Sequence, residues 1–146
     1  MQTPTSKLQK FKQLSAPDQW LVIRAAYWLG IARVMLAAMP FQRLSERLAA
    51  DQTEPSPQPN PKYLDRVGFA IRAAANNVPW RSNCFPQTIA ARMILRRQGY
   101  ASTIHLGVEK SGEGGIAGHA WLTCGEAVVT GGKELDRYTE MHRINA

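Results

Sequence analysis

Two residues of this 146-residue chain combine as a nucleophile and a base. Cys84 lies where the pattern predicts a helix start, after Ser82 and Asn83 and with Pro86 in the first turn. The unpaired N–H groups and the dipole of a helix N-terminus stabilise a thiolate, and the same N–H groups can donate to an oxyanion. His119 follows 35 residues later on a predicted strand with a glycine before it. Taken alone, the pair has two interpretations: a structural cysteine and histidine, or nucleophilic thiol chemistry at a carbonyl carbon with the histidine moving the proton.

The other cysteine and the other histidines have structural interpretations. Cys124 falls on the strand face opposite His119 and is expected to pack as a small core residue. His105 is expected on the solvent side or as a satisfied polar residue, and His142 on the surface. Two cysteines exclude a disulfide-dense scaffold and an all-cysteine zinc site. No paired ligand spacing is present, so we expect no metal and no cofactor.

The elements that must position the pair are helices first and strands after them. Ser15 is predicted to cap the first helix, with Asp18 at a capping-box-like spacing and Pro40 at the end of the apolar run. Further helices are predicted over 41–48, 63–77 and 83–98, and strands over 103–108, 119–123 and 127–130. Residues 110–118 are expected to form a flexible loop, with 112–118 as a plain connection or a mobile lid. Helices followed by a short antiparallel sheet define an α+β fold.

Positive charge is concentrated in the helical parts of the chain. The net charge is +7, and residues 1–50 and 63–100 each carry +5. The pattern indicates a solvated basic face or a polyanion-binding surface. The apolar run 20–39 is long enough to cross a membrane, but Arg24 and Arg33 would each cost about 2.5–3.5 kcal/mol at a bilayer centre. A buried helix is therefore favoured over membrane insertion.

A proline-rich stretch divides the chain. Residues 51–62 hold four prolines at alternate positions, which predicts an extended connector. The expected organisation is an N-terminal helical extension over 1–50, the connector over 51–62 and the core over 63–146. The polar start, Met1 to Lys12, lacks the features of a secretory signal, and a cytoplasmic location is expected.

Two blocks of the core resemble the transglutaminase-like cysteine proteases of lasso-peptide biosynthesis. They are residues 84–108, which begin Cys-Phe-Pro-Gln-Thr, and Gly118-His119-Ala120-Trp121. Val78-Pro79-Trp80 and Met39-Pro40-Phe41 extend the resemblance, which is to the stand-alone leader peptidase without its leader-binding domain. It implies a papain/transglutaminase-like core, in which a helix carrying the cysteine packs on a small antiparallel sheet carrying the histidine.

The resemblance also implies an activity and partners. The expected reaction is cleavage of a ribosomally made precursor between leader and core, with Cys84 as nucleophile and His119 as general base and acid. The implied partners are the lasso precursor peptide, a separate leader-binding (PqqD-like) protein and the ATP-dependent lasso cyclase. Neither nucleic acid nor membrane contact is expected.

The third catalytic position departs from the family pattern, in which an acidic residue orients the histidine from the next strand. A two-residue turn at Gly125-Glu126 would put His119 opposite Gly132, and a four-residue turn would put it opposite Thr130. Neither position carries a carboxylate. Asp136 from a loop is the first candidate for this role, and Thr130 is the alternative.

Several alternatives remain open. Trp80 and Trp121 line the substrate cleft or fill the core beside it. Arg92, Arg96 and Arg97 form a solvated helix face or a docking surface. The chain itself is a peptidase, a transferase of the same chemistry, a non-catalytic peptide-binding scaffold of the same fold, or a basic binder of nucleic acid or membrane surfaces.

Overall fold

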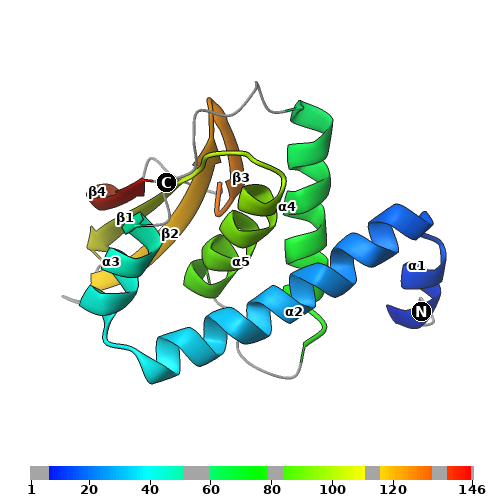
Figure 1. Ribbon diagram of the computed structural model, residues 1–146, viewed down its shortest axis with the longest axis horizontal. Coiled ribbons are helices and arrows are strands. Elements are labelled where there is room, and N and C mark those ends of the chain that lie inside the picture. The colour runs from blue at the N-terminus through cyan, green and yellow to red at the C-terminus, as the bar shows by residue number, and fades with distance from the viewer. Residues whose placement is uncertain (1–6, 51–59, 79–83, 111–115, 133–137, 146) are drawn as a thin grey trace.

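The computed structural model describes residues 7–50, 60–78, 84–110, 116–132 and 138–145. Within these ranges, helices precede strands (Figure 1). The helices are α1 (Lys7–Lys12), α2 (Ala16–Ala38), α3 (Phe41–Ala50), α4 (Pro61–Ala75) and α5 (Cys84–Arg97). The strands are β1 (Thr103–Lys110), β2 (Ile116–Cys124), β3 (Ala127–Thr130) and β4 (Thr139–Asn145). The predicted α+β class is confirmed.

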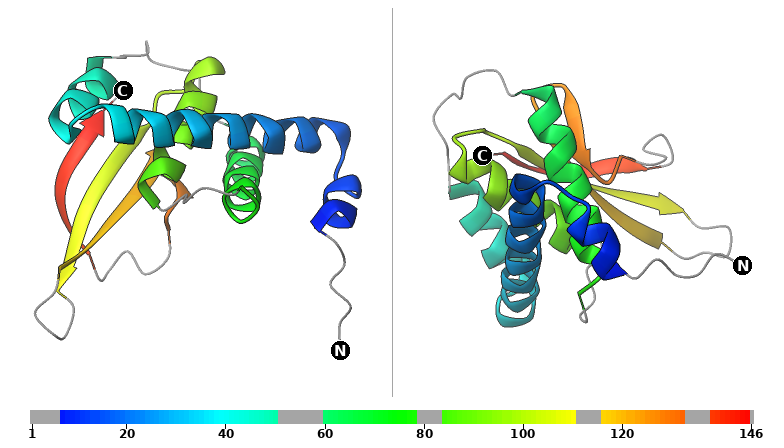
Figure 2. Two further views of the ribbon diagram at one scale, coloured as in Figure 1. Left: turned by 90° about the horizontal axis from the view of Figure 1, so that it is seen from below. Right: turned by 90° about the vertical axis from the view of Figure 1, so that its right-hand side faces the viewer.

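The helices form two layers on one side of the sheet. Helix α5 packs on β2, β3 and β1, while α4 contacts β3 and α3 contacts β4. Helix α2 packs across α4 and α5 on the side away from the sheet, as Figure 2 shows. The helix that begins with Cys84 is therefore held between the sheet and an outer helix.

The predicted start of α2 is confirmed. The Ser15 hydroxyl accepts from the Asp18 backbone N–H at 3.4 Å and donates to the Asp18 carboxylate at 2.9 Å. Arg66 of α4 also donates to this carboxylate, at 2.7 Å. The Arg66 and Ser15 hydrogen bonds lower the pKa of Asp18. The cap of α2 is thus also a contact with α4.

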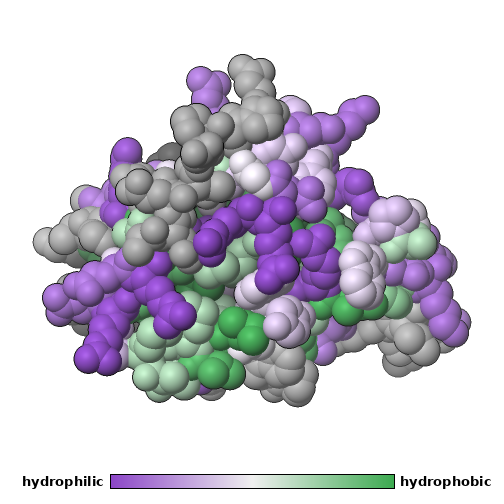
Figure 3. Space-filling model, in the orientation of Figure 1, coloured by the Kyte–Doolittle hydropathy of each residue, from purple (hydrophilic) through white to green (hydrophobic). Residues whose placement is uncertain are grey.

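Helix α2 has one packed face and one exposed apolar face. Its buried residues are Leu21, Ala25, Leu29 and Ala32. Its exposed large residues are Trp20, Ile23, Tyr27 and Val34, and Figure 3 shows apolar surface along the lower edge, where α2 runs in Figure 1. By length and composition alone, α2 is also apolar enough to cross a membrane, although core helices of soluble proteins pass the same test.

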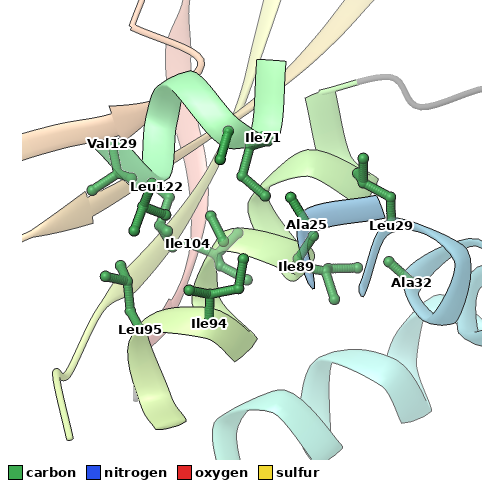
Figure 4. Close-up of a cluster of buried hydrophobic side chains, with 14 of the residues drawn as sticks. Ala25, Leu29, Ala32, Ile71, Ile89, Ile94, Leu95, Ile104, Leu122 and Val129 are labelled. Carbon is green, nitrogen blue, oxygen red and sulfur yellow. The ribbon is translucent and has the colours of Figure 1, made fainter. Parts of the chain in front are cut away.

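The core joins helices from both sides of the proline-rich stretch. Figure 4 shows Leu29 and Ala32 of α2 in one cluster with Ile71 of α4 and Ile94 of α5. Strand residues Ile104, Leu122 and Ile144 complete the cluster on the sheet side. Residues 51–59 of the predicted connector lie outside the described ranges, but the helices before and after them bury side chains together.

The sheet is antiparallel, with strand order β3-β2-β1-β4. Two elements were not predicted: α1 at the N-terminus and β4, which pairs with β1 at the edge opposite β3. The loop predicted over 110–118 is too long, because β1 continues to Lys110 and β2 begins at Ile116. Residues 116–118 therefore belong to a strand rather than to a lid, while 111–115 lie outside the described ranges.

Arg92 corrects the prediction that the α5 arginines form a solvated face. Its side chain is 1% exposed. Nη1 donates to the Ile144 carbonyl of β4 at 2.9 Å, and Nη2 donates to the Leu48 carbonyl of α3 at 2.6 Å. Arg96 and Arg97 are exposed, and Arg97 lies 4.9 Å from the centre of the Trp28 ring. Arg92 is therefore an internal connection between three elements.

Gly68 allows α4 to approach β3 closely. A Cβ at this position would lie 2.6 Å from the Val129 carbonyl oxygen, which belongs to the backbone. We expect Gly68→Ala to lower the free energy of unfolding by about 1–3 kcal/mol, the range for overpacking a closed contact. Urea unfolding followed by circular dichroism measures this, with the exposed Phe69→Ala as the neighbouring control. Equal stability of Gly68→Ala and wild type would show that α4 and β3 are not in close contact.

Candidate active site

Cys84 is the first residue of α5 and is half-buried. The helix behind it is fixed by buried residues on most of its length, which are Pro86, Thr88, Ile89, Ala90, Ala91, Arg92, Ile94 and Leu95. Phe85 packs against Phe41, with ring centres 6.0 Å apart. The N–H groups of the first turn have no acceptor within their own helix. The thiol therefore lies beside backbone N–H groups that can donate hydrogen bonds to a bound group.

His119 lies on β2, where it pairs with Gly107 of β1. Its Nε2 is 2.7 Å from the carbonyl oxygen of Gly131. A carbonyl only accepts, so Nε2 must carry the proton of this hydrogen bond. In the neutral imidazole Nδ1 is then the unprotonated nitrogen, the form a general base requires. A backbone carbonyl thus selects the tautomer of His119.

A β-bulge between β2 and β3 positions the Gly131 carbonyl next to His119. The predicted two-residue turn is confirmed, because Cys124 pairs with Ala127 and Thr123 with Val128. The register then shifts, and Leu122 pairs with Thr130. The regular register, which would have put His119 opposite Gly132, therefore does not continue beyond Thr123.

Gly131 is the residue that this arrangement requires. Its φ of 72° is in the left-handed region, and a Cβ there would lie 2.4 Å from the Ala120 carbonyl oxygen. This role of Gly131 was not predicted from the sequence. The signal available was the Gly131-Gly132 pair directly after a strand, which is typical of special backbone geometry.

We expect Gly131→Ala to displace the carbonyl that holds His119. The added Cβ has no room and the backbone conformation is disfavoured for alanine, so a stability loss of about 1–3 kcal/mol is expected. In long-range ¹⁵N–¹H NMR spectra of the histidine rings, wild type should show His119 protonated at Nε2, and the variant a mixture of tautomers. An unchanged Nε2-protonated signal in a folded variant would contradict this role for the Gly131 carbonyl.

The His119 ring is part of an aromatic stack on the sheet. It lies 4.5 Å from the Tyr138 ring and 6.0 Å from the Trp121 ring, both at 22° between planes. Trp121 stacks in turn on His105 at 5.2 Å and 4°. These contacts limit rotation of the imidazole about its own axis, so the hydrogen bond to Gly131 is supported by packing.

His105 is a satisfied polar residue, one of the two predicted alternatives. Its Nδ1 is 2.5 Å from Glu140 of β4, and its Nε2 is 2.8 Å from the hydroxyl of Thr123. The hydrogen bond from Arg143, followed by that from His105, lowers the pKa of Glu140. His105 is therefore a fixed support for the Trp121 ring.

Two cavities meet at Cys84 and His119, which line both of them. The first has a volume of about 490 Å³ and is lined by Arg33, Cys84, Phe85, Pro86, Leu106, Gly107, Gly118, His119 and Ala120. The second has a volume of about 510 Å³ and is lined by Arg72, Ala75, Asn76, Cys84, Gln87, His119, Val128, Val129, Gly131 and Gly132. The structure thus brings the predicted nucleophile, Cys84, and the predicted base, His119, together at the boundary of two cavities.

The structure does not bring Thr130 to the imidazole. Thr130 pairs with Leu122, which puts both on the core face, and its hydroxyl has no hydrogen-bond partner among the described residues. Asp136, the first candidate for the third position, lies outside the described ranges, as do Trp80 and the side chain of His142. Trp121 is buried in the ring stack and is not a lining residue of either cavity.

Cys124 is buried in the core, as predicted. Its thiol donates to the Ala101 carbonyl at 3.3 Å, and burial raises its pKa. In the part of the chain that the structure describes, no three His, Cys, Asp or Glu side chains are grouped so that they could hold a metal ion.

The two cysteines should therefore differ in reactivity. At neutral pH a raised pKa leaves less Cys124 thiolate, and burial blocks access. Treatment of the folded protein with iodoacetamide should add one carbamidomethyl group, located on Cys84 by peptide mass mapping. Modification of Cys124 at a comparable rate without unfolding would contradict this assignment.

A helix starting with the cysteine, packed on an antiparallel sheet that carries the histidine, defines a papain/transglutaminase-like core. The family model described as the transglutaminase-like superfamily matches residues 26–143. The chain belongs to this superfamily. The superfamily includes cysteine peptidases and transglutaminases. Searches of curated proteins and of solved structures gave no match.

Proposed function

We propose that this protein is a cysteine peptidase that cleaves a peptide bond through an acyl-thioester on Cys84. The observation that carries the proposal is the meeting of Cys84 and His119 between two cavities, with Nδ1 of His119 left as the basic nitrogen. An extended peptide crossing from one cavity to the other would present its carbonyl carbon at this point.

The first half of the reaction forms the thioester. His119 Nδ1 takes the thiol proton, and the Cys84 sulfur adds to the scissile carbonyl carbon. N–H groups at the start of α5 donate to the resulting oxyanion. The tetrahedral intermediate collapses as the imidazolium returns its proton to the leaving amine, and the C–N bond breaks.

The second half releases the acyl group. His119 removes a proton from water, and the hydroxide adds to the thioester carbon. Collapse expels the Cys84 thiolate, which recovers a proton from the imidazolium, and leaves a new carboxylate on the N-terminal fragment. An amine in place of water would give a transferase, which the same residues support equally well.

The proposed substrate is a lasso precursor peptide, cut between leader and core in the cytoplasm. Support comes from the sequence resemblance around Cys84 and His119 described above. On this proposal a separate leader-binding protein presents the precursor, and the released core amine passes to the ATP-dependent cyclase.

The test is reconstitution with a precursor peptide and the leader-binding protein, followed by mass spectrometry. Two fragments are expected, and in H₂¹⁸O the new carboxylate of the leader should gain one heavy oxygen. Binding of the intact precursor with no cleavage would instead support the non-catalytic scaffold. That second candidate is favoured by one observation, that the partner of His119 Nε2 is a carbonyl rather than a carboxylate.

A further inference from the structure

We propose that the peptide taken by this site carries carboxylate side chains on both sides of the reacting carbonyl, held by Arg33 in one cavity and Arg72 in the other. The inference rests on the proposed function and names the substrate class of that site. Nothing in it depends on whether the acyl group goes to water or to an amine.

The two arginines lie in different cavities and come from different helices. Arg33 of α2 lines the first cavity together with Gly107 of β1 and Gly118 of β2. Arg72 projects from α4 into the cavity bounded by β3. Both are exposed, so both guanidinium groups are accessible to a peptide.

Arg72 is directed to its cavity by local packing. One of its terminal nitrogens would lie 3.3 Å from a Cβ at Gly68, so the guanidinium lies beside the close approach of Gly68 to the Val129 backbone. Asn76 and Gln87 line the same cavity and add amide groups beside this charge. The far side of the cavity, formed by Val128 and Val129, is apolar.

Among the described residues, each cavity beside the thiol is lined by one arginine. Among the described lining residues of either cavity there is no aspartate or glutamate. The start of α5 adds the positive end of a helix dipole at Cys84. Arginine binds carboxylates through two parallel N–H donors, which favours acidic side chains over neutral ones of the same shape.

A peptide that fills only one cavity would use one arginine. A peptide that presents an internal backbone carbonyl to Cys84 can extend into both cavities, because Cys84 and His119 line both of them. A peptide with an acidic residue on each side of the reacting bond can therefore pair one carboxylate with Arg33 and the other with Arg72. This holds for either direction of the peptide.

The first part of the experiment measures the electrostatics without any substrate. Iodoacetate and iodoacetamide alkylate Cys84 by the same reaction but differ by one negative charge, so the ratio of their rates cancels changes in thiolate content. At low ionic strength we expect Arg33→Gln and Arg72→Gln each to lower this ratio about two- to fivefold. Arg43→Gln, which removes the same charge from exposed α3, should leave the ratio unchanged.

The second part measures peptide binding as protection of Cys84 from iodoacetamide. The probes are capped six-residue peptides with two glycines flanked on each side by Glu, by Gln or by Lys. We expect the Glu peptide to protect at the lowest concentration and the Lys peptide at the highest. The Arg33→Gln/Arg72→Gln double variant should lose this order, and Arg43→Gln should keep it.

Equal protection by the three peptides, or a rate ratio unaffected by both arginine variants, would overturn the inference. Neither the alkylation rates nor the protection of Cys84 depends on cleavage of a substrate. Failure of the precursor to be cleaved, with the order of the peptides preserved, would refute the peptidase and leave the acidic-peptide site standing.

Discussion

If the proposed function holds, replacing Cys84 with alanine should leave the precursor peptide intact under conditions in which wild type cleaves it. Without the sulfur no thioester forms, and His119 has no thiol to deprotonate. Loss of a nucleophile of this kind lowers kcat by about 10⁴-fold or more. Mass spectrometry of the reconstituted mixture measures the remaining precursor and both fragments over time.

Cys124→Ala is the matched control for this variant. It removes the other thiol of the chain from the core face of β2, away from both cavities. The Cys124→Ala variant should have a lower free energy of unfolding because it loses packing in the core, but it should still cleave the precursor. Cleavage by Cys84→Ala at the wild-type rate, with both variants folded, would refute covalent catalysis by this residue.

The largest stability effect is expected at Arg92. Arg92→Met keeps much of the side-chain volume but leaves the Leu48 and Ile144 carbonyls without their donor. A buried carbonyl that loses its partner costs about 1–3 kcal/mol, so the two together predict a loss of about 2–6 kcal/mol. The midpoint of urea unfolding, followed by circular dichroism, measures it.

Arg96→Met, one residue from the end of the same helix, provides the comparison. Arg96 is exposed, and its substitution should change stability by about 0.5 kcal/mol or less. Equal midpoints for the Arg92 and Arg96 variants would show that the internal connection between α3, α5 and β4 contributes little.

Helix starts and the tight turn were predicted correctly, because each depends on residues that are close together in the sequence. Ser15 and Asp18 specified the start of α2 because a cap is satisfied within four residues. Gly125 and Glu126 specified the β2–β3 turn for the same reason. The position of Cys84 at the start of α5 followed from the residues around it.

Long-range geometry could not be predicted in this way. An arginine on a helix is expected to be exposed. Arg92 is buried because its guanidinium donates to carbonyls 44 and 52 residues away in sequence. Strand β4 mixes charged and apolar residues and is stabilised as a strand by its pairing with β1. No residue of β3 itself indicates the bulge that shifts its register. The sequence therefore predicted a side-chain partner for His119, whereas the structure provides the backbone carbonyl of Gly131.

The proposed mechanism requires Cys84 to carry the acyl group of the substrate. The most direct measurement is the intact mass of the protein after acid quenching of a reaction with excess precursor. Covalent catalysis by Cys84 predicts an adduct whose mass is the leader fragment less one water, located on the peptide containing Cys84 and absent from Cys84→Ala. Leader and core fragments formed at the wild-type rate by Cys84→Ala, with no adduct on the wild-type protein, would contradict it.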